Sequence, residues 1–280
     1  LAYAAARHIT VIPEIEMPGH SAEVLHAYPE LLCQHAGKQN TDFCVGNEQT
    51  FLFLENVLKE VMKVFPSKYI HIGGDEASRK AWKTCPRCQQ RMKEEKLTTV
   101  AELQSYLTER IERFLNRHGR ILIGWDEILE GKLAPNAVVM SWRGEKGGIE
   151  AAKAGHDVIM TPGRYCYLDH YQDFPPSQPK AFGSYMPLEQ CYSFDPACRL
   201  PDSIANHVLG VQGNLWTEQV ETMSHCEYML YPRLFAIAEN GWSNSKTDFA
   251  DFRRRALHMQ DVWVSRGYHP FDLRKEIGER

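Results

Sequence analysis

Carboxylates and aromatic rings recur directly after short apolar segments of this sequence. Asp75 and Glu76 follow residues 69–73, and similar residues follow the other apolar segments. The residues expected at these positions are Glu14, Glu16, His20, Trp125, Trp142, Tyr167, Asp169, Trp216 and Glu218. Aromatic rings stack on the C–H faces of sugars, and carboxylates accept hydrogen bonds from hydroxyl groups. Because no glycine-rich phosphate loop or basic cluster accompanies them, the pattern predicts a carbohydrate ligand rather than a phosphate.

The adjacent residues Asp75 and Glu76 have side chains suited to acid–base chemistry. Ionising two neighbouring carboxyl groups at once is unfavourable, so one of them can hold a proton while the other carries a charge. Acidic pairs also occur at surface turns and helix N-termini. The position of this pair after His71-Ile-Gly-Gly, at the end of an apolar segment, favours the catalytic interpretation.

The tryptophans and His71 divide by their place in the chain. Those that end apolar segments are expected to contact the ligand: Trp125, Trp142 and Trp216. Those in helical or connecting segments are expected in the core: Trp82, Trp242 and Trp263. His71 lies within an apolar segment and is expected to be a hydrogen-bonded core histidine rather than a catalyst.

Short aliphatic segments alternate with amphipathic ones along the chain. The predicted strands are residues 10–14, 69–73, 121–124, 138–142, 158–161 and 209–213. The predicted helices are residues 50–65, 99–118, 147–154, 227–239 and 246–266. Consecutive apolar positions are typical of parallel strands buried on both faces, and the alternation predicts a parallel α/β fold.

The length of 280 residues suits a TIM-type (β/α)8 barrel, which typically has about 250 residues. Residues that follow barrel strands meet at one face, where catalysis takes place. We expect residues 1–280 to be a catalytic barrel domain with strands 3 to 8 and a C-terminal helix. The first two strands and any further domain are expected upstream of Leu1. Residues 164–202 lack periodicity and are predicted to form a long functional loop.

Composition argues against two classes of partner. The formal net charge is −4 and the basic residues are scattered, unlike the clustered basic surface of nucleic-acid-binding proteins. The longest apolar runs are far shorter than the roughly 20 residues of a membrane span. The expected partner is a glycan or oligosaccharide, with no cofactor, and no sequence feature fixes an oligomeric state.

The eight cysteines raise the question of a metal site. Cys33 and Cys44 flank a short polar loop and could form a disulfide in an oxidising compartment. Cys85-Pro-Arg-Cys88 has the spacing of half a zinc site, but no second pair at matching spacing follows it, so free or locally paired thiols are expected. His20 could join Asp75 and Glu76 around a metal, yet no His-x-His or His-Glu-x-x-His spacing supports this, and the prediction is no metal.

Several motifs occur in the order found in glycoside hydrolase family 20, and the sequence resembles that family over nearly its whole length. The main motifs are Pro13-Glu-Ile-Glu-Met-Pro-Gly-His20, His71-Ile-Gly-Gly-Asp75-Glu76, Gly124-Trp-Asp-Glu127, Ser141-Trp-Arg143, Tyr167-Leu-Asp169 and Asn214-Leu-Trp-Thr-Glu218. The resemblance continues through Pro232-Arg-Leu and Ala238-Glu-Asn-Gly-Trp242. It implies an exo-acting β-N-acetylhexosaminidase that removes terminal N-acetylglucosamine or N-acetylgalactosamine by a substrate-assisted retaining mechanism.

The resemblance also implies a role for each matching residue. Glu76 is the general acid and then the base, and Asp75 holds the acetamide N–H so that the carbonyl oxygen attacks the anomeric carbon. Tyr167 donates to the acetamide oxygen, and His20 orients Glu76. Three tryptophans enclose the acetyl methyl group: Trp125, Trp142 and Trp216. Asp169 and Glu218 bind sugar hydroxyls, and Glu16 supports Asp75.

The sequence departs from the family pattern in three respects. Glu16 stands where many members have Asp, which puts its contact with Asp75 in question. The family's sugar-binding arginine of the first strand has no counterpart, and neither has the acidic partner of the histidine. Both are expected upstream of Leu1. Three alternatives therefore stay open: a non-catalytic carbohydrate-binding barrel, a relative of the lacto-N-biosidases, and another barrel hydrolase such as a chitinase, although the chitinase motif Asp-x-x-Asp-x-Asp-x-Glu is absent.

The expected location is the periplasm, the cell surface or the exterior of a bacterium. The sequence has no Asn-x-Ser/Thr acceptor, which disfavours a eukaryotic secreted glycoprotein.

Overall fold

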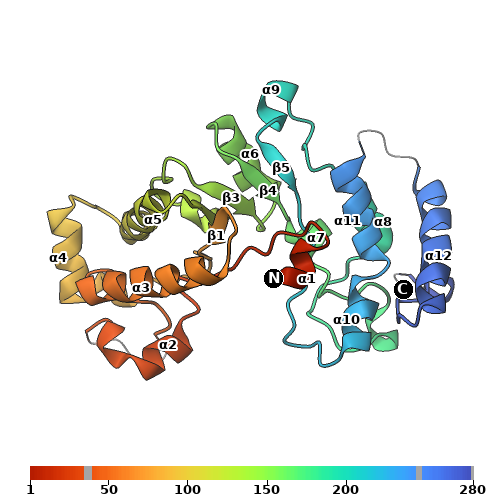
Figure 1. The fold of residues 1–280 in the computed structure, drawn as a ribbon, viewed down its shortest axis with the longest axis horizontal. Coiled ribbons are helices and arrows are strands. Elements are labelled where there is room, and N and C mark those ends of the chain that lie inside the picture. Colours follow the sequence, from red (N-terminus) through yellow and green to blue (C-terminus); the bar gives the residue numbers. More distant parts are fainter. Residues whose placement is uncertain (35–39, 244–247, 279–280) are drawn as a thin grey trace. The chain divides into compact units, whose positions relative to one another are not determined.

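The structure is a computed structural model that describes residues 1–34, 40–243 and 248–278. The chain divides into two compact units, Leu1–Met140 and Ser141–Arg280 (Figure 1). Within the described residues, no helix is both long enough and apolar enough to cross a membrane.

The first unit is built on three parallel strands in sequence order: β1 (Tyr69–His71), β2 (Ile121–Trp125) and β3 (Val138–Ser141). Tyr69 pairs with Ile121, and Ile123 pairs with Val138. The helices of this unit are α1 (Ala2–Ala5), α2 (Ala22–Ala27), α3 (Glu48–Val64), α4 (Pro86–Glu94) and α5 (Val100–Arg117). Short 3-10 turns lie at η1 (Pro29–Leu31), η2 (Ala81–Lys83) and η3 (Asp126–Leu129).

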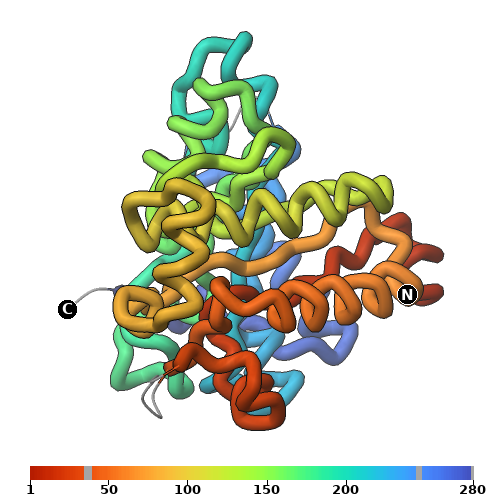
Figure 2. The backbone as a smooth tube through the Cα atoms, turned by 90° about the vertical axis from the view of Figure 1, so that its left-hand side faces the viewer, coloured from red at the N-terminus to blue at the C-terminus, as the bar shows by residue number. Residues whose placement is uncertain are grey.

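Helices α3 and α5 confirm the predictions for residues 50–65 and 99–118. They lie side by side and run in the same direction (Figure 2), and α5 packs against β2. Leu103, Leu107 and Ile111 recur every four residues on α5 and are fully buried, as expected of an amphipathic helix that covers a sheet. The start of α5 is fixed by a capping box, in which Thr99 accepts from the Glu102 N–H and the Glu102 side chain returns to the Thr99 N–H.

The predicted strand 10–14 is wrong as a strand. Only Glu14 makes a bridge there, to His71, while the His71 N–H donates to the Pro13 carbonyl at 3.0 Å. Pro13 has no N–H to continue a ladder, and Ile9, Val11 and Ile12 are exposed rather than buried. The described residues therefore contain five strands instead of six.

The second unit contains two parallel strands, β4 (Val158–Met160) and β5 (Val208–Val211), which pair with one another. The larger helices around them are α6 (Glu145–Lys153), α8 (Leu188–Ser193), α10 (Met223–Leu230), α11 (Arg233–Trp242) and α12 (Phe249–Ser265). Short turns are α7 (Gly163–Cys166), η4 (Pro175–Ser177), α9 (Asp202–Ala205) and η5 (Leu273–Lys275).

Two predictions for this unit need correction, and a third is confirmed within the described residues. The helix expected at 227–239 is two helices, because Pro232 cannot continue α10. Residues 164–202 are not one long loop, since α7, η4 and α8 interrupt them and aromatic stacking closes them, with Tyr165 and Phe194 ring centroids 5.0 Å apart. The helix expected at 246–266 is α12, although residues 246 and 247 lie outside the described part.

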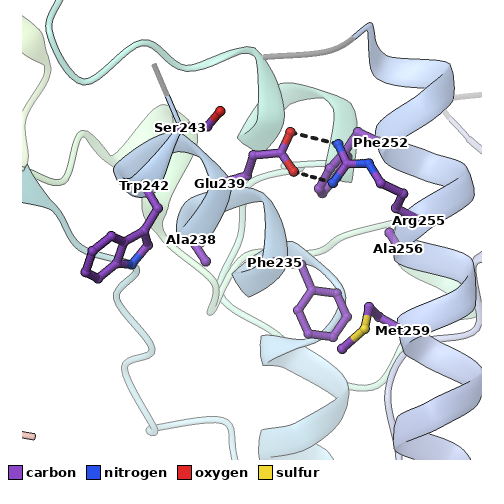
Figure 3. A pocket seen from close by; sticks show the side chains of 9 residues that line it. All are labelled: Phe235, Ala238, Glu239, Trp242, Ser243, Phe252, Arg255, Ala256 and Met259. Carbon is purple, nitrogen blue, oxygen red and sulfur yellow. Dashed lines mark hydrogen bonds and ion pairs between the residues drawn. The ribbon is translucent and has the colours of Figure 1, made fainter. Parts of the chain in front are cut away.

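The C-terminal helices enclose a pocket between α11 and α12 (Figure 3). Glu239 and Arg255 form a two-pronged ion pair at its rim, at 2.6 and 2.8 Å. Trp242 was expected in the core but is 92% exposed at the end of α11, whereas Trp82 is fully buried as expected. None of the residues predicted to act on a ligand lines this pocket.

Candidate active site

The loop after β1 turns sharply and brings Glu16 against its backbone. Gly73 and Gly74 have φ values of 68° and 95°, a region that favours glycine. The Gly74 N–H donates to Glu16 Oε1 at 2.9 Å. A Cβ atom on Gly73 would lie 1.8 Å from Glu16 Oε2, so the absence of a side chain at Gly73 makes room for the Glu16 carboxyl.

His20, Asp75 and Glu76 come together at the end of this loop. His20 Nε2 lies 3.4 Å from Asp75 Oδ2 and 3.3 Å from Glu76 Oε2. The Asp75 side chain is 16% exposed and that of Glu76 is 58% exposed, so only Glu76 reaches freely into solvent. His20 and Glu76 both have left-handed backbone conformations, with φ of 45° and 47°. Such conformations are costly for residues with a side chain and concentrate at functional sites.

The second oxygen of Asp75 has no N–H donor. Asp75 Oδ1 is buried and accepts no hydrogen bond from an N–H group of the described residues, while the protonated Glu16 carboxyl hydrogen-bonds to the Asp75 carboxylate. An unsatisfied buried acceptor is unfavourable by about 1–3 kcal/mol. A ligand N–H or O–H at this position would satisfy it.

Burial controls the ionisation of the carboxyl groups behind Asp75. Removal from water, reinforced by the nearby Asp75 carboxylate, raises the pKa of Glu16 to about 10. Partial burial also raises the pKa of Glu14, an effect that the Trp125 hydrogen bond opposes. Glu16 is therefore neutral near pH 7, and the contact between Glu16 and Asp75 persists without placing two full charges side by side.

Glu14, His71 and Trp125 contact one another next to this cluster, with His71 and Trp125 buried and Glu14 exposed. The Trp125 indole N–H donates to Glu14 Oε1 at 2.9 Å, and the His71 and Trp125 rings lie 4.8 Å apart. His71 accepts from the Gly73 N–H at 3.0 Å, and burial lowers the pKa of His71 to about 3. This confirms His71 as a neutral core histidine. Trp125 is only 3% exposed, and its predicted contact with a ligand stays a prediction.

Sequence reasoning missed two residues that hydrogen-bond to the backbone of the loop after β1. The buried Asp42 carboxylate accepts from the Arg79 N–H at 2.7 Å and from the Ser78 N–H at 3.3 Å. Gln104 Nε2 donates to the Gly74 carbonyl at 2.7 Å. Both side chains are distant from the loop in sequence, so no local pattern pointed to them.

In the second unit the structure brings Trp142 and Tyr167 together. Their rings stack with centroids 6.1 Å apart and an interplanar angle of 26°. Tyr167 forms a parallel bridge with Asn214, two residues before Trp216. Trp216 is 39% exposed.

Asp169 and Glu218 are the carboxylates of this second group. Asp169 is almost fully buried, and its Oδ1 has no hydrogen-bond partner among the described residues. Burial, opposed by Arg233 and assisted by Glu218, raises the pKa of Asp169 to about 6. Asp169 thus offers a second unsatisfied acceptor, and Glu218 is exposed.

Arg233 fixes the backbone that carries Tyr167 and Asp169. It is fully buried and donates to four carbonyl groups, those of Leu168, His170, Met186 and Met229, at 2.5 to 3.1 Å. Arg233 therefore has a structural role.

Each unit thus presents a distinct chemical capability. The first holds a buried acceptor, Asp75, next to an exposed carboxyl group and a histidine, an arrangement suited to proton transfer. The second holds aromatic rings beside carboxylates, an arrangement suited to sugar binding. The ligand atoms of Glu14, Glu16 and Asp75 lie within 4.8 Å of one another, but a protonated Glu16 is a poor metal ligand.

Comparison with known proteins adds independent information. A family model described as "Glycosyl hydrolase family 20, catalytic domain" matches residues 1–245. A β-hexosaminidase of Porphyromonas gingivalis is 51% identical over 264 residues, which are 90% of this chain and 34% of that protein. A β-hexosaminidase of Vibrio furnissii is 39% identical, over 86% of this chain and 42% of that protein. The chain thus spans about a third to two fifths of the length of these relatives.

Solved structures agree with the sequence relatives. The exo β-N-acetylglucosaminidase of Vibrio harveyi, in complex with N-acetylglucosamine, matches 96% of this chain and 44% of its own, with a TM-score of 0.89 and 30% identity. The β-N-acetylhexosaminidase of Bacteroides fragilis matches 99% of this chain and 58% of its own, with a TM-score of 0.86 and 32% identity. These likenesses confirm the predicted α/β fold as part of a TIM-type barrel.

Proposed function

Because the chain belongs to glycosyl hydrolase family 20, we propose that it provides the catalytic machinery of an exo-acting retaining β-N-acetylhexosaminidase. Its substrates are glycans that end in N-acetylglucosamine or N-acetylgalactosamine. The observation that carries the proposal is the unpartnered buried oxygen of Asp75 next to the exposed carboxyl group of Glu76. The names of the relatives support the substrate class, since they are β-hexosaminidases and an exo β-N-acetylglucosaminidase.

Asp75 positions the internal nucleophile. Its free Oδ1 accepts the N–H of the substrate acetamide, so that the acetamide carbonyl oxygen turns toward the anomeric carbon. As that oxygen attacks, positive charge develops on the acetamide nitrogen, and the ionised Asp75 stabilises it. The neutral Glu16 behind Asp75 allows this single charge to persist without a second one beside it.

Glu76 transfers the proton. It protonates the glycosidic oxygen as the leaving group departs, which yields an oxazoline-like intermediate. The ionised Glu76 then takes a proton from the water that opens this intermediate, and the original anomeric configuration is retained. His20, at 3.3 Å from Glu76 and 3.4 Å from Asp75, holds the orientation of both carboxyl groups.

The residues of the second unit take the recognition roles implied by the family. Tyr167 donates to the acetamide oxygen, and Trp142 and Trp216 contact the acetyl methyl group. Asp169 and Glu218 accept hydrogen bonds from sugar hydroxyls. Only an N-acetyl sugar carries the acetamide group that acts as the nucleophile. Recognition of the acetyl group therefore selects the sugars that can react and aligns their nucleophile.

The test compares nitrophenyl N-acetyl-β-glucosaminide with nitrophenyl β-glucoside, using the protein in its natural full length. We expect at least about a hundredfold preference in kcat/KM for the N-acetyl sugar, because the glucoside lacks the nucleophile. Equal turnover of both sugars would overturn the substrate-assisted mechanism. Binding of N-acetylglucosamine without turnover of either sugar would indicate a carbohydrate-binding barrel.

Substitution of the two carboxyl residues separates their roles. Asp75→Asn should lower kcat on the N-acetyl sugar by about 10²–10⁴-fold. Glu76→Gln should impair substrates with poor leaving groups far more than nitrophenyl substrates, which need little protonation. Glu23→Gln, at an exposed position of α2, is the control and should leave both rates unchanged. Full activity of Asp75→Asn would contradict the role of the acetamide.

A further inference from the structure

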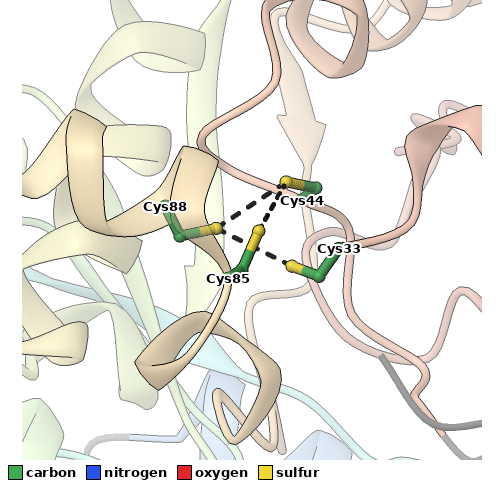
Figure 4. A group of neighbouring side chains, drawn as sticks. All are labelled: Cys33, Cys44, Cys85 and Cys88. Atoms are coloured by element: carbon green, nitrogen blue, oxygen red, sulfur yellow. Dashed lines mark hydrogen bonds between the residues drawn. The ribbon is translucent and has the colours of Figure 1, made fainter. Parts of the chain in front are cut away.

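Four cysteines from two distant parts of the sequence converge in the first unit (Figure 4). Cys33 and Cys44 lie on either side of the polar loop that follows η1. Cys85 immediately precedes α4, and Cys88 lies in its first turn. All four side chains are buried, and none forms a disulfide. Cys33 and Cys44 therefore supply a second pair to match the half zinc site at Cys85 and Cys88. Sequence reasoning missed this pair because it lies upstream and its two members are eleven residues apart.

The sulfur positions match the corners of a metal-centred tetrahedron. Sγ–Sγ distances are 3.7 Å for Cys33–Cys88, Cys44–Cys85 and Cys44–Cys88, and all four sulfurs lie within 4.8 Å of one another. A tetrahedral zinc ion with Zn–S bonds of about 2.3 Å places its sulfurs about 3.8 Å apart. A disulfide needs about 2.05 Å, far shorter than any of these distances.

The backbone segment that contains Cys44 packs very closely against the start of α4. A Cβ atom on Gly46 would lie 2.1 Å from the Arg87 carbonyl carbon, so only glycine lets the 40–47 segment pack on the start of α4.

We propose that Cys33, Cys44, Cys85 and Cys88 bind one Zn²⁺ ion as a closed structural site. Four protein thiolates leave no open coordination position for substrate or water, so the ion has no catalytic role. Zinc is favoured over an iron–sulfur cluster because a cluster distributes its four cysteines over two or four irons and so spreads the sulfurs further apart.

The ion would stabilise the two loops that carry the proton-transfer residues. Phe43, next to Cys44, donates its N–H to the Pro18 carbonyl at 2.9 Å, two residues before His20. Its carbonyl accepts from the Trp82 indole at 2.9 Å, and Asp42 holds the Ser78 and Arg79 N–H groups that follow Glu76. Metal binding to the four cysteines therefore fixes the segment that joins the His20 loop to the Asp75–Glu76 loop.

The first experiment measures metal content and coordination in the unmodified protein. Elemental analysis should find about one zinc per chain, and X-ray absorption at the zinc edge should give four sulfur neighbours at about 2.3 Å. Replacement by Co²⁺ should produce the absorption bands of a tetrahedral thiolate site. Zinc bound through nitrogen or oxygen would overturn the proposal. So would stoichiometric iron, or a metal-free protein whose mass is about four hydrogens lower because two disulfides have formed.

Variants then locate the site. Cys85→Ser and Cys33→Ser should each lower zinc content by at least about tenfold and lower the thermal midpoint. Cys226→Ser, at a half-buried cysteine of α10, is the matched control and should keep the full zinc content. Because a cysteine variant could lose zinc through misfolding, the sulfur count from the unmodified protein decides the assignment. Full zinc retention in Cys85→Ser would exclude this site.

Discussion

Glu16, Asp75 and Glu76 lie in one cluster, but each carboxyl group has different surroundings. Glu16 is removed from water and holds its proton to about pH 10. Asp75 is mostly buried with one unsatisfied oxygen, and Glu76 is exposed. These environments suit a neutral support, a charged positioning group and a proton carrier in direct contact with substrate.

Glu16→Gln tests the neutral state of Glu16. Its pKa is about 10 in the folded chain and about 4.5 when unfolded. The unfolded chain therefore ionises first as pH rises, so this group's contribution to stability is complete below pH 4.5 and is lost between pH 4.5 and about 10. We expect Glu16→Gln to keep the fold and to lose less stability than the parent between pH 5 and 9, measured by thermal unfolding.

Glu23→Gln provides the comparison for that experiment, because its carboxyl group is exposed. It should reproduce the pH profile of the parent. Parallel profiles of stability against pH for Glu16→Gln and the parent would show that Glu16 is ionised in the folded protein. Its contact with Asp75 would then not involve a neutral carboxyl group.

Much of the candidate site could be predicted from local sequence. His20, Asp75 and Glu76 follow recognisable segments, and the structure brings them within ion-pair distance. Asp42, Gln104 and the pairing of Cys33 and Cys44 with Cys85 and Cys88 could not be predicted. They depend on tertiary contacts between segments that are distant in sequence, and the spacing of residues along the chain does not reveal such contacts.

At the scale of elements, the turn after β1 depends on Gly73. Gly73→Ala places a methyl group on the Glu16 carboxyl and strains a φ of 68°, whereas Gly119→Ala strains a nearly equal φ of 70° in open space. The control should cost about 1–2 kcal/mol for the left-handed backbone alone. Gly73→Ala should cost more in unfolding free energy and should also lower kcat, because Glu16 is displaced. Equal losses of unfolding free energy in the two variants would show that the Glu16 carboxyl moves aside without destabilising the fold.

Arg233 anchors the second unit through four carbonyl groups. Arg233→Met keeps much of the volume but removes every donor, so the carbonyls of Leu168, His170, Met186 and Met229 lose partners. We expect a loss of at least about 3 kcal/mol in unfolding free energy. Arg254→Met, on the exposed face of α12, is the control and should change stability by less than about 0.5 kcal/mol. A mild effect of Arg233→Met would mean that water replaces the guanidinium.

The elements themselves were predictable where one face is buried. Helices α3, α5 and α6 have apolar stripes, and strands β1 to β3 have consecutive buried residues. The predictions of elements fail where proline residues or aromatic stacking, rather than hydrophobic periodicity, determine the structure. Pro232 divides a continuous helical pattern, Pro13 interrupts strand pairing, and aromatic stacking orders residues 164–202 without any period.

At the scale of the whole molecule, the chain divides into two compact units. The first core gathers around β1, β2 and α5, and the second around β4, α8 and α11. The proton-transfer residues belong to the first unit, and most of the predicted sugar-recognition residues belong to the second. The expected location outside the cytoplasm stays a prediction.

This division predicts where each perturbation acts first. Local opening follows local packing, so loss of a contact should raise hydrogen exchange mainly in the unit that contains it. In Cys88→Ser, amides of residues 40–47 and of α4 should exchange faster while those of α8 and α11 keep their protection. In Arg233→Met the pattern should reverse. Faster exchange spread evenly over both units in either variant would mean that the two cores open as one cooperative body, and the roles assigned to each unit would then have to be tested together.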